Sequence, residues 1–403
     1  MRICLVSYEF PPIGGGEGAY TNDLIRALSA KGLEVVLIVP KWPGLSINRP
    51  NQNHSVIHVD PLLLPGFKTT SFMLRANRKL KQIAGRIDII HYTNDYCGFG
   101  MSSAEIGKPV LATLHHTHYL ESTSVLPRVK QNIISEVKFR VSQRFLARLE
   151  WSTLRNADSI IAVSNYTAEN AKIVYPSLSS RIRVVLNGID ESRFSPGLNG
   201  NIFRSTLGLS SEPIVLYVGR IALSKGLRFL IDAFYTVVKE IPEAKLVIVG
   251  SGAREEEAIL KAQVTLSNMN SSVIFTGRVN AEELPMIYAS SDLVVLPSLV
   301  EGFGLVLLEA MAESKPVVTT NVGPTTEIIS DGVEGVLVPS ADTRALADGI
   351  LKILGDKSLS AWMGEQGRRK VERLFTLDRW STQMVELYED CLANFNSTSR
   401  GNR

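Results

Sequence analysis

The stretch PSLVEGFGLVLLEAMAESKP, residues Pro297–Pro316, carries the strongest structural signal in the sequence. Just before it, Leu293–Leu296 is a short apolar run, which is typical of a parallel strand buried on both faces. Leu305–Met311 then has the apolar pattern of a helix that packs against that strand. The stretch therefore predicts a strand, a glycine-containing loop and a helix, which is the repeating unit of a parallel α/β sheet.

Two glutamates of this stretch, Glu301 and Glu309, are the first candidate site residues. An ionised Glu301 in the loop would accept hydrogen bonds from sugar hydroxyls, and Glu309 would accept from a ribose. On their own, two glutamates eight residues apart are more often ordinary surface charge. Backbone N–H groups at the helix start would have no intrahelical partner and could donate to ligand oxygens. These groups belong to Gly302, Phe303, Gly304 and Leu305.

A second candidate site follows the expected strand 214–218, where Gly219 and Arg220 precede a short loop, Lys225 and another amphipathic helix. Ligands of open parallel α/β sheets bind beyond the carboxyl ends of the strands, so these two cations would neutralise a diphosphate there. Alone, such a pair is ordinary solvated charge. Because it precedes the glutamate loop by a few strand–helix units, we expect both sites to meet at one edge of a sheet.

Six motifs resemble, in their order and spacing, those of the retaining glycosyltransferases of family 4, which use nucleotide-sugar donors and have the GT-B architecture. They are FPPIGGGEGAY (10–20), VLNGIDESRFSP (185–196), YVGRIALSKG (217–226), LVIVGSG (246–252), VIFTGRV (273–279) and EGFGLVLLE (301–309). The resemblance covers nearly the whole chain. It implies an α/β fold of two doubly wound, Rossmann-like domains that face each other across a cleft, with a C-terminal helix crossing back.

Apolar runs that alternate with helical patterns support this architecture, since such alternation predicts parallel sheets with helices on both faces. The expected strands are 2–7, 34–39, 56–59, 88–91, 110–114, 159–163 and 183–186, and then 214–218, 245–249, 273–275, 293–296, 316–319 and 335–338. We expect an acceptor-side domain over 1–195, joined by a crossing helix at 377–395, and a nucleotide-sugar-binding domain over 196–376. A disordered polar tail is expected over 396–403.

The resemblance implies roles for the residues of the second domain. Arg220 and Lys225 would stabilise the charge that develops on the leaving diphosphate, and Glu301 would hold the sugar hydroxyls. Glu309 would hold the ribose. Further donor-binding positions are Gly219, Gly250, and the backbone around Arg278 and Val279, which would contact the base.

In the first domain, Gly15 and Gly16 belong to a glycine-rich turn after the first strand, and the resemblance implies that they face the donor phosphates. The turn lacks the G-x-G-x-x-G spacing, which disfavours a dinucleotide oxidoreductase. His115 matches the family's active-site histidine, near the anomeric centre of the donor. A loop histidine that only caps strand ends remains the alternative.

Two more histidines follow His115 in the sequence ATLHHTH, namely His116 and His118. Zinc is disfavoured here, because no Cys or carboxylate at ligand spacing joins them and neighbouring residues on an extended chain point to opposite sides. No D-x-D pair stands at a strand end, as a metal-bridged diphosphate would require. We therefore expect no protein-bound metal and no cofactor.

The composition excludes several classes of protein. With 403 residues, 45% hydrophobic and 21% charged, the chain is a globular protein with room for two cores. Its 43 Lys and Arg against 40 Asp and Glu give no net charge that would favour nucleic acid. The cysteines, Cys4, Cys97 and Cys391, are scattered, which indicates a reducing compartment. No signal peptide and no apolar run of about 18 residues is found, so we expect a cytosolic protein or one attached to a membrane from that side.

Two segments combine basic and apolar side chains. Residues 61–86 contain Lys68, Arg75, Arg78, Lys79, Lys81 and Arg86 with Leu62, Leu63, Leu64, Phe67, Phe72 and Met73. Residues 128–149 contain six cations and one acid, Glu136, with the apolar row Ile134, Val137, Val141, Phe145 and Leu149. Such segments favour an anionic leaflet, at about 1 kcal/mol per cation near the surface. The alternative is that both apolar sets face the core of the first domain.

We expect the chain to transfer a sugar from a nucleoside-diphosphate donor to a hydroxyl of a glycan or lipid-linked acceptor, with retention of configuration. No second catalytic carboxylate accompanies His115, which fits attack by the acceptor from the face that the phosphate leaves. A sugar-nucleotide epimerase or an inverting transferase on the same architecture is one alternative. A non-enzymatic sugar-nucleotide sensor is the other.

Overall fold

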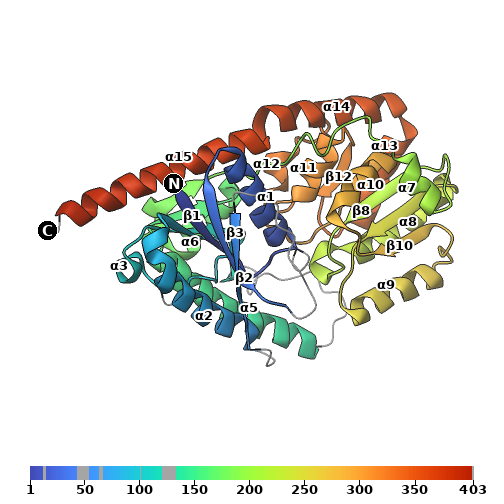
Figure 1. Cartoon of the computed structure of the whole chain (residues 1–403). Helices are drawn as coiled ribbons and strands as arrows, with labels where there is room; N and C mark the ends of the chain where they lie inside the picture. The colour runs from blue at the N-terminus through green and yellow to red at the C-terminus, as the bar shows by residue number, and fades with distance from the viewer. Residues whose placement is uncertain (12–14, 43–53, 63–66, 100, 120–132, 402–403) are drawn as a thin grey trace. The chain divides into compact units, whose positions relative to one another are not determined.

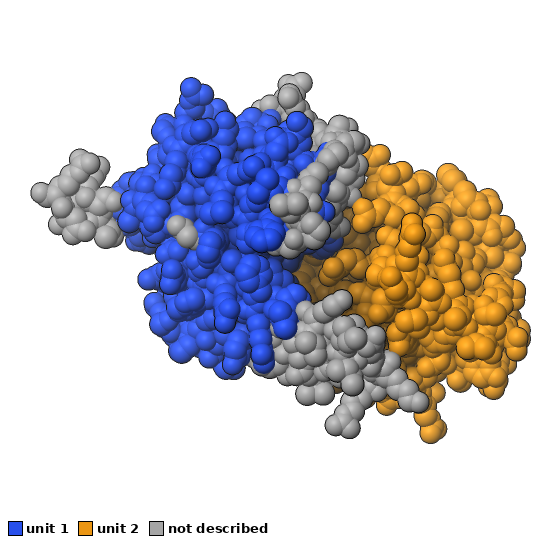
Figure 2. All heavy atoms as spheres, turned by 90° about the horizontal axis from the view of Figure 1, so that it is seen from below, with its two compact units in different colours: residues 1–188, 377–403 blue, residues 189–376 orange. Residues whose placement is uncertain are grey.

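The computed structural model describes residues 1–11, 15–42, 54–62, 67–99, 101–119 and 133–401 (Figure 1). The chain forms two compact units, coloured separately in Figure 2. Unit 1 comprises Met1–Gly188 and Leu377–Arg403, and unit 2 comprises Ile189–Thr376. Each unit contains one parallel sheet covered by helices, so the predicted pair of doubly wound α/β domains is confirmed.

The sheet of unit 1 has seven strands in the order β3-β2-β1-β4-β5-β6-β7, all parallel to their neighbours. Its strands are β1 (Arg2–Val6), β2 (Glu34–Pro40), β3 (His54–Val59), β4 (Ile89–Tyr92), β5 (Val110–Leu114), β6 (Ser159–Ala162) and β7 (Ile182–Val184). Successive residues of a strand point to opposite faces, and both faces are buried here. Cys4 and Val6 belong to the large core, while Ile3 and Leu5 are equally buried on the other face.

Helices follow most of these strands along the chain. They are α1 (Gly16–Ala30), α2 (Lys68–Ile83), α3 (Ser103–Ile106), α5 (Ile133–Asn156) and α6 (Asn165–Val174), with 3-10 turns η1 (Ala84–Arg86) and η2 (Pro176–Arg181). The long helix α15 (Leu377–Gly401) returns to this unit and packs along α1 (Figure 1). Its Trp380 ring contacts the ring of Tyr20 in α1, with centroids 5.0 Å apart.

The sheet of unit 2 has six strands in the order β10-β9-β8-β11-β12-β13, again all parallel. They are β8 (Ile214–Val218), β9 (Lys245–Val249), β10 (Val273–Gly277), β11 (Leu293–Leu296), β12 (Val317–Thr320) and β13 (Gly335–Val338). The helices are α7 (Asn201–Thr206), α8 (Leu227–Glu240), α9 (Arg254–Leu266), α10 (Leu284–Ser290), α11 (Leu305–Ala312), α12 (Thr325–Ile328), α13 (Thr343–Gly355) and α14 (Lys357–Leu374), with turns η3 (Leu223–Lys225) and η4 (Ala281–Glu283). Because every strand runs the same way, the loops after β8, β9, β10 and β11 share one edge of the sheet.

Two expected boundaries differ from the structure. The units divide after Gly188 rather than after residue 195, because the intervening segment is bonded to unit 2. The N–H of Ile189 donates to the carbonyl of Phe375 at 2.8 Å, and the N–H of Ser195 donates to the Glu313 carboxylate at 3.0 Å.

The C-terminal end is the second difference. Helix α15 continues to Gly401, so the expected disordered tail from residue 396 is wrong over this range. The hydroxyl of Ser397 donates to the carbonyl of Asn394 at 2.8 Å. A polar side chain that bonds back to the preceding turn is compatible with helix, and polarity alone therefore did not end it.

Candidate functional site

The edge formed by the carboxyl ends of the unit 2 strands gathers most of the predicted site residues. Hydrogen bonds between neighbouring loops continue the sheet beyond its strands. The Gly219 N–H donates to Val249 at 3.0 Å, and the Leu299 N–H donates to the Ser224 carbonyl at 2.7 Å. The loops after β8, β9 and β11 are thereby held against one another, and the two candidate sites of unit 2 become one.

Two glycines allow the loops to approach this closely. A Cβ on Gly250 would lie 1.9 Å from the carbonyl oxygen of Gly219, and one on Gly226 would lie 1.9 Å from the carbonyl oxygen of Pro297. Both residues also have positive φ, 137° and 67°, which side chains disfavour. Gly250, a predicted donor-binding position, thus allows the loops after β8 and β9 to pack closely at this edge.

Lys225 and Glu301 form the central ion pair of the edge, with 2.9 Å between the ammonium nitrogen and Oε2. The Ser298 hydroxyl donates to the same oxygen at 2.9 Å. Burial alone would raise the pKa of Glu301, but the Lys225 charge and the bonds from Lys225, Ser298 and the Gly302 N–H outweigh it and lower that pKa. Glu301 is therefore an ionised acceptor at neutral pH, fixed beside a cation.

Arg220 supplies a second cation of a different kind. Its side chain is exposed and, within the described part of the chain, makes no hydrogen bond or ion pair. Only its backbone carbonyl is engaged, accepting from the hydroxyl of Tyr217 at 2.7 Å. The guanidinium is consequently free to bind an anion in a planar, two-pronged manner.

The amino end of α11 supplies donors at the same edge. Gly304 precedes the helix with φ 99°, and the Gly302 N–H contacts its neighbour's carboxylate at 3.3 Å. Among the described residues, the N–H groups of Phe303 and Leu305 donate no hydrogen bond. Arg278 and Val279 follow β10 at this edge, where Arg278 is exposed and Val279 half-buried. These groups make the edge suited to oxygen-rich, negatively charged ligands.

Glu309 lies inside α11 and is half-buried. Burial raises its pKa, although the hydroxyl of Tyr288, which donates to Oε2, and the charge of Arg193 oppose this rise. One carboxylate oxygen is thus held by Tyr288, and the other has no hydrogen-bond partner among the described residues. Burial thus disfavours the charged form of Glu309, and a carboxyl group retained in such an environment is typical of a functional position.

In unit 1, His115 is buried after β5. Its Nε2 lies 2.9 Å from the carbonyl oxygen of Thr93, and its ring packs edge-to-face on Tyr20 at 4.8 Å. Burial lowers the pKa of His115 to about 4, so the ring is neutral. Since a carbonyl only accepts, we assign the proton to Nε2, which leaves Nδ1 as an acceptor. The ring therefore caps the end of β4, as expected for a loop histidine with only a structural role. Its Nδ1 has no hydrogen-bond partner among the described residues and could accept one from a ligand.

The glycine-rich turn is engaged within unit 1. The Gly15 N–H donates to the Glu9 carboxylate at 2.7 Å, whereas Gly16 is exposed at the first position of α1. The side chain of Glu17 lies close by, and burial together with the charges of Glu9 and Asp95 raises its pKa to about 8. A donor phosphate would compete with Glu9 for the Gly15 amide.

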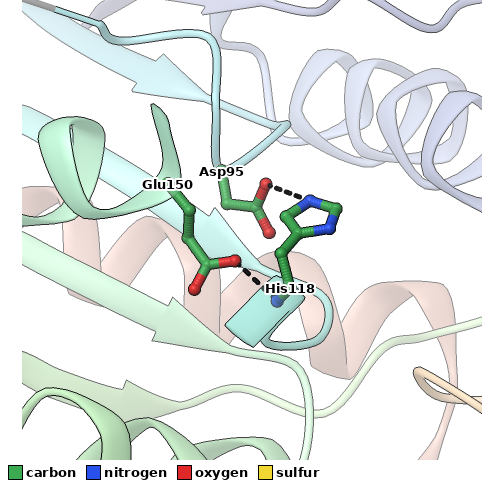
Figure 3. A group of neighbouring side chains, drawn as sticks. All are labelled: Asp95, His118 and Glu150. Carbon is green, nitrogen blue, oxygen red and sulfur yellow. Dashed lines mark hydrogen bonds and ion pairs between the residues drawn. The ribbon is translucent and has the colours of Figure 1, made fainter. Parts of the chain in front are cut away.

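A buried cluster that the sequence did not reveal lies beside these residues (Figure 3). It consists of Asp95, His118 and Glu150, each of which turns a polar atom toward the others. Sequence spacing argued against carboxylate ligands beside the histidines, but the fold brings two carboxylates to His118. Only the adjacency of β4 and β5 and the position of α5 against β5 could have predicted this.

The basic segments are exposed in part. Phe67 and Leu62 of the first segment are exposed, whereas Phe72 and Met73 are buried in the core, so their place in a surface patch was wrong. In the second segment, Val141 and Phe145 are exposed and Leu149 is buried. Leu63, Leu64, Arg128, Lys130 and the side chains of Ile134, Val137 and Lys138 lie outside the described residues. No described helix has both the length and the apolar content that crossing a bilayer demands.

Two Rossmann-like units, each with one parallel sheet, are the architecture of GT-B glycosyltransferases. The family model described as Glycosyltransferase Family 4 matches residues 14–193, and the one described as Glycosyl transferases group 1 matches residues 201–370. The chain belongs to the group 1 glycosyltransferase family, as its motifs predicted.

Relatives agree with this assignment. A D-inositol 3-phosphate glycosyltransferase of Corynebacterium urealyticum is 30% identical over 290 residues, which cover 69% of this chain and 67% of that one. A GDP-mannose-dependent alpha-(1-6)-phosphatidylinositol monomannoside mannosyltransferase of Mycolicibacterium smegmatis is 27% identical, with 94% of each chain covered. The solved sucrose-phosphate synthase of Thermosynechococcus elongatus is 26% identical with a TM-score of 0.79, over 98% of this chain and 100% of that one.

Proposed function

We propose that this glycosyltransferase moves a sugar from a nucleoside-diphosphate donor to a hydroxyl of a glycan or lipid-linked acceptor, with retention of configuration. The observation that carries the proposal is the edge of unit 2, where the Lys225–Glu301 ion pair and the exposed Arg220 stand beside free helix-start amides. A relative whose name states GDP-mannose dependence supports a nucleotide-sugar donor.

The cations would act on the leaving group. Negative charge develops on the diphosphate as the glycosidic bond breaks, and groups already fixed toward that charge stabilise the transition state without reorganising. Lys225 is fixed by Glu301, and an ammonium has three N–H donors, so it can hold this carboxylate and a phosphate oxygen together. Arg220 would clamp the diphosphate from the solvent side.

The carboxylates would position the donor. Glu301 uses Oε2 for Lys225 and Ser298. Its Oε1 accepts from the Gly302 N–H at 3.3 Å and keeps a lone pair for a sugar hydroxyl. The free oxygen of Glu309 would accept from the ribose. We assign the base to the backbone at Arg278 and Val279, and phosphate oxygens to the amides of Phe303, Gly304 and Leu305.

Retention would follow from attack on the face that the diphosphate leaves, with the departing phosphate taking the acceptor proton. His115, neutral through burial, would accept a sugar hydroxyl at Nδ1, and Gly15 and Gly16 remain assigned to the donor phosphates. The proposal assigns no covalent nucleophile and no divalent ion to the reaction.

The acceptor and the location form a further part of the proposal. One relative's name specifies inositol 3-phosphate and another a phosphatidylinositol mannoside, and both are polyhydroxylated. We assign the chain to the cytoplasm, with docking on an anionic membrane through the exposed Phe67, Val141 and Phe145 and the basic side chains around them.

A ligand screen and a product analysis test the proposal. The donor is sought by thermal shift against uridine, guanosine and adenosine diphosphates and their sugars, since a ligand at 100 times its Kd stabilises by about 2.7 kcal/mol. NMR of the product formed with that donor then reports the anomeric configuration. An α-linked product from an α-linked donor is expected. A product of inverted configuration would indicate an inverting transferase, and an epimerised donor without transfer would indicate an epimerase. Donor binding without turnover in a cell extract would indicate a non-enzymatic sensor.

A further inference from the structure

The side chains of Asp95, His118 and Glu150 converge in the interior of unit 1 (Figure 3). Asp95 follows β4, His118 follows β5 and Glu150 lies in the last third of α5. One ligand-type atom from each residue lies within 4.8 Å of the other two. Asp95 and Glu150 are fully buried and His118 is 4% exposed, so water does not stabilise their charges.

Asp95 lacks the partners that a buried carboxylate needs. Among the described residues, neither of its oxygens accepts a hydrogen bond, and Nε2 of His118 also has no hydrogen-bond partner. Within the described ranges, no Lys or Arg forms an ion pair with Asp95 or Glu150, and the imidazole of His118 faces Asp95 at 3.5 Å. A buried carboxylate that accepts no hydrogen bond is strongly unfavourable unless positive charge lies beside it. The cluster therefore calls for positive charge between these atoms.

The spacing of Asp95 and His118 fits a shared ion better than a shared proton. Oδ1 and Nε2 are 3.5 Å apart. A charge-assisted N–H···O bond spans about 2.7–2.9 Å, which is clearly shorter. Two ligands on one tetrahedral zinc ion, each at about 2.1 Å from it, are about 3.4 Å apart.

Gln143 orients the imidazole as a metal ligand would require. Nδ1 of His118 lies 2.7 Å from the amide oxygen of Gln143. Because this oxygen only accepts, Nδ1 donates. A metal that displaces the proton of Nε2 would therefore meet the lone pair of that nitrogen on the side of Asp95. Metal-binding histidines are held in this way by a carbonyl or carboxylate on their second nitrogen.

Glu150 is held in place by two hydrogen bonds. Its Oε2 accepts from the backbone N–H of His118 at 2.9 Å, and Oε1 accepts from the hydroxyl of Tyr175 at 2.6 Å. Each carboxylate oxygen has a second lone pair, so both bonds are compatible with metal coordination. All three candidate ligands are thus fixed by the fold.

We propose that Asp95, His118 and Glu150 bind one divalent cation of the zinc class, with Gln143 orienting His118. One imidazole and two carboxylates suit zinc and balance its charge. The ion would fasten the loop after β4 and the loop after β5 to α5. All three candidate ligands belong to unit 1, and none of them is assigned a part in the leaving-group chemistry.

Zinc binding by the full-length, tag-free chain tests the proposal. The protein is stripped with a chelator and then titrated with Zn²⁺ in competition with a chromophoric chelator. We expect one equivalent to bind and to raise the melting temperature. Asp95→Asn and His118→Gln should abolish both effects. Gln143→Leu keeps the ligands and should weaken binding by about 10- to 100-fold. His58→Gln removes an exposed histidine elsewhere and should bind as the wild type does.

Circular dichroism confirms that each variant is folded. A folded wild-type chain that binds no Zn²⁺ and gains no stability from it would overturn the proposal and indicate a cluster neutralised by protons alone. Equal affinity of Asp95→Asn and the wild type would also overturn it. Unchanged affinity in Gln143→Leu would contradict the orienting role of that residue. Since no substrate is used, these outcomes are independent of the glycosyl transfer reaction.

Discussion

Arg220 and Lys225, the two cations proposed to bind the diphosphate, should differ sharply when each is replaced by alanine. Arg220→Ala removes an exposed side chain that makes no hydrogen bond or ion pair to the described residues, so the unfolding free energy should change by less than about 0.5 kcal/mol. Loss of one charge-assisted contact to the transition state costs about 3 kcal/mol, so kcat/KM should fall about 100-fold.

Lys225→Ala should lower both activity and stability. Its side chain is only 19% exposed and that of Glu301 only 10%, so the substitution leaves a nearly buried carboxylate without its cation. Breaking a fully buried pair costs about 3–5 kcal/mol, and for this slightly exposed pair we expect about 2 kcal/mol. Glu301→Gln should lower turnover similarly. Its effect on stability should not add to that of Lys225→Ala, because both changes break the same pair.

The assays are initial rates with the identified donor and urea unfolding of each purified variant at pH 7. Arg344→Ala is the matched control, because that arginine of unit 2 is 93% exposed and lies on α13. It should retain wild-type activity and stability. Wild-type kcat/KM in Arg220→Ala would refute the diphosphate assignment. Equal destabilisation by Arg220→Ala and Lys225→Ala would refute the reasoning from burial.

Four further predictions concern other parts of the molecule. EDTA in the assay should leave turnover largely intact, because no divalent ion is assigned to the reaction. A loss of turnover that millimolar Mg²⁺ reverses, but one equivalent of Zn²⁺ at the proposed unit 1 site does not, would contradict this. Glu309→Gln should weaken donor binding but melt no lower than the wild type at pH 7. Burial raises the pKa of Glu309 in the folded state, so ionisation of this carboxyl destabilises the folded protein increasingly as the pH rises above about 4. A Glu309→Gln variant that melts below the wild type at pH 7 would contradict this argument. Gly250→Ala should destabilise by more than 1 kcal/mol, because its Cβ would meet the Gly219 carbonyl at 1.9 Å; unchanged urea unfolding would disprove the clash. In sedimentation with liposomes at low salt, anionic vesicles should recover more protein than neutral ones, and Phe67→Ser should reduce the difference; equal recovery would exclude the docking surface.

The sequence by itself determined the secondary structure and the class of fold. Every strand expected from an apolar run appears in the structure. Five of them have the expected bounds, namely Val110–Leu114, Ile214–Val218, Lys245–Val249, Leu293–Leu296 and Gly335–Val338. Strand formation is readable because a strand buried on both faces needs a continuous apolar run, which is a local property. The family followed from motifs, which are local as well. Polar composition was a poorer guide, since α15 continues through its polar end to Gly401.

The sequence predicted that the loops of Lys225 and Glu301 share one edge of a sheet, but only the tertiary structure decided which polar side chains pair there. Lys225 and Glu301 are 76 residues apart in the chain and 2.9 Å apart in space, because their loops follow β8 and β11, which are neighbours in the sheet. Asp95 and His118 meet for the same reason at β4 and β5, where residue spacing had argued against a metal. Strand order is set by the packing of the whole domain, so proximity across neighbouring strands leaves no mark in the spacing of residues along the sequence.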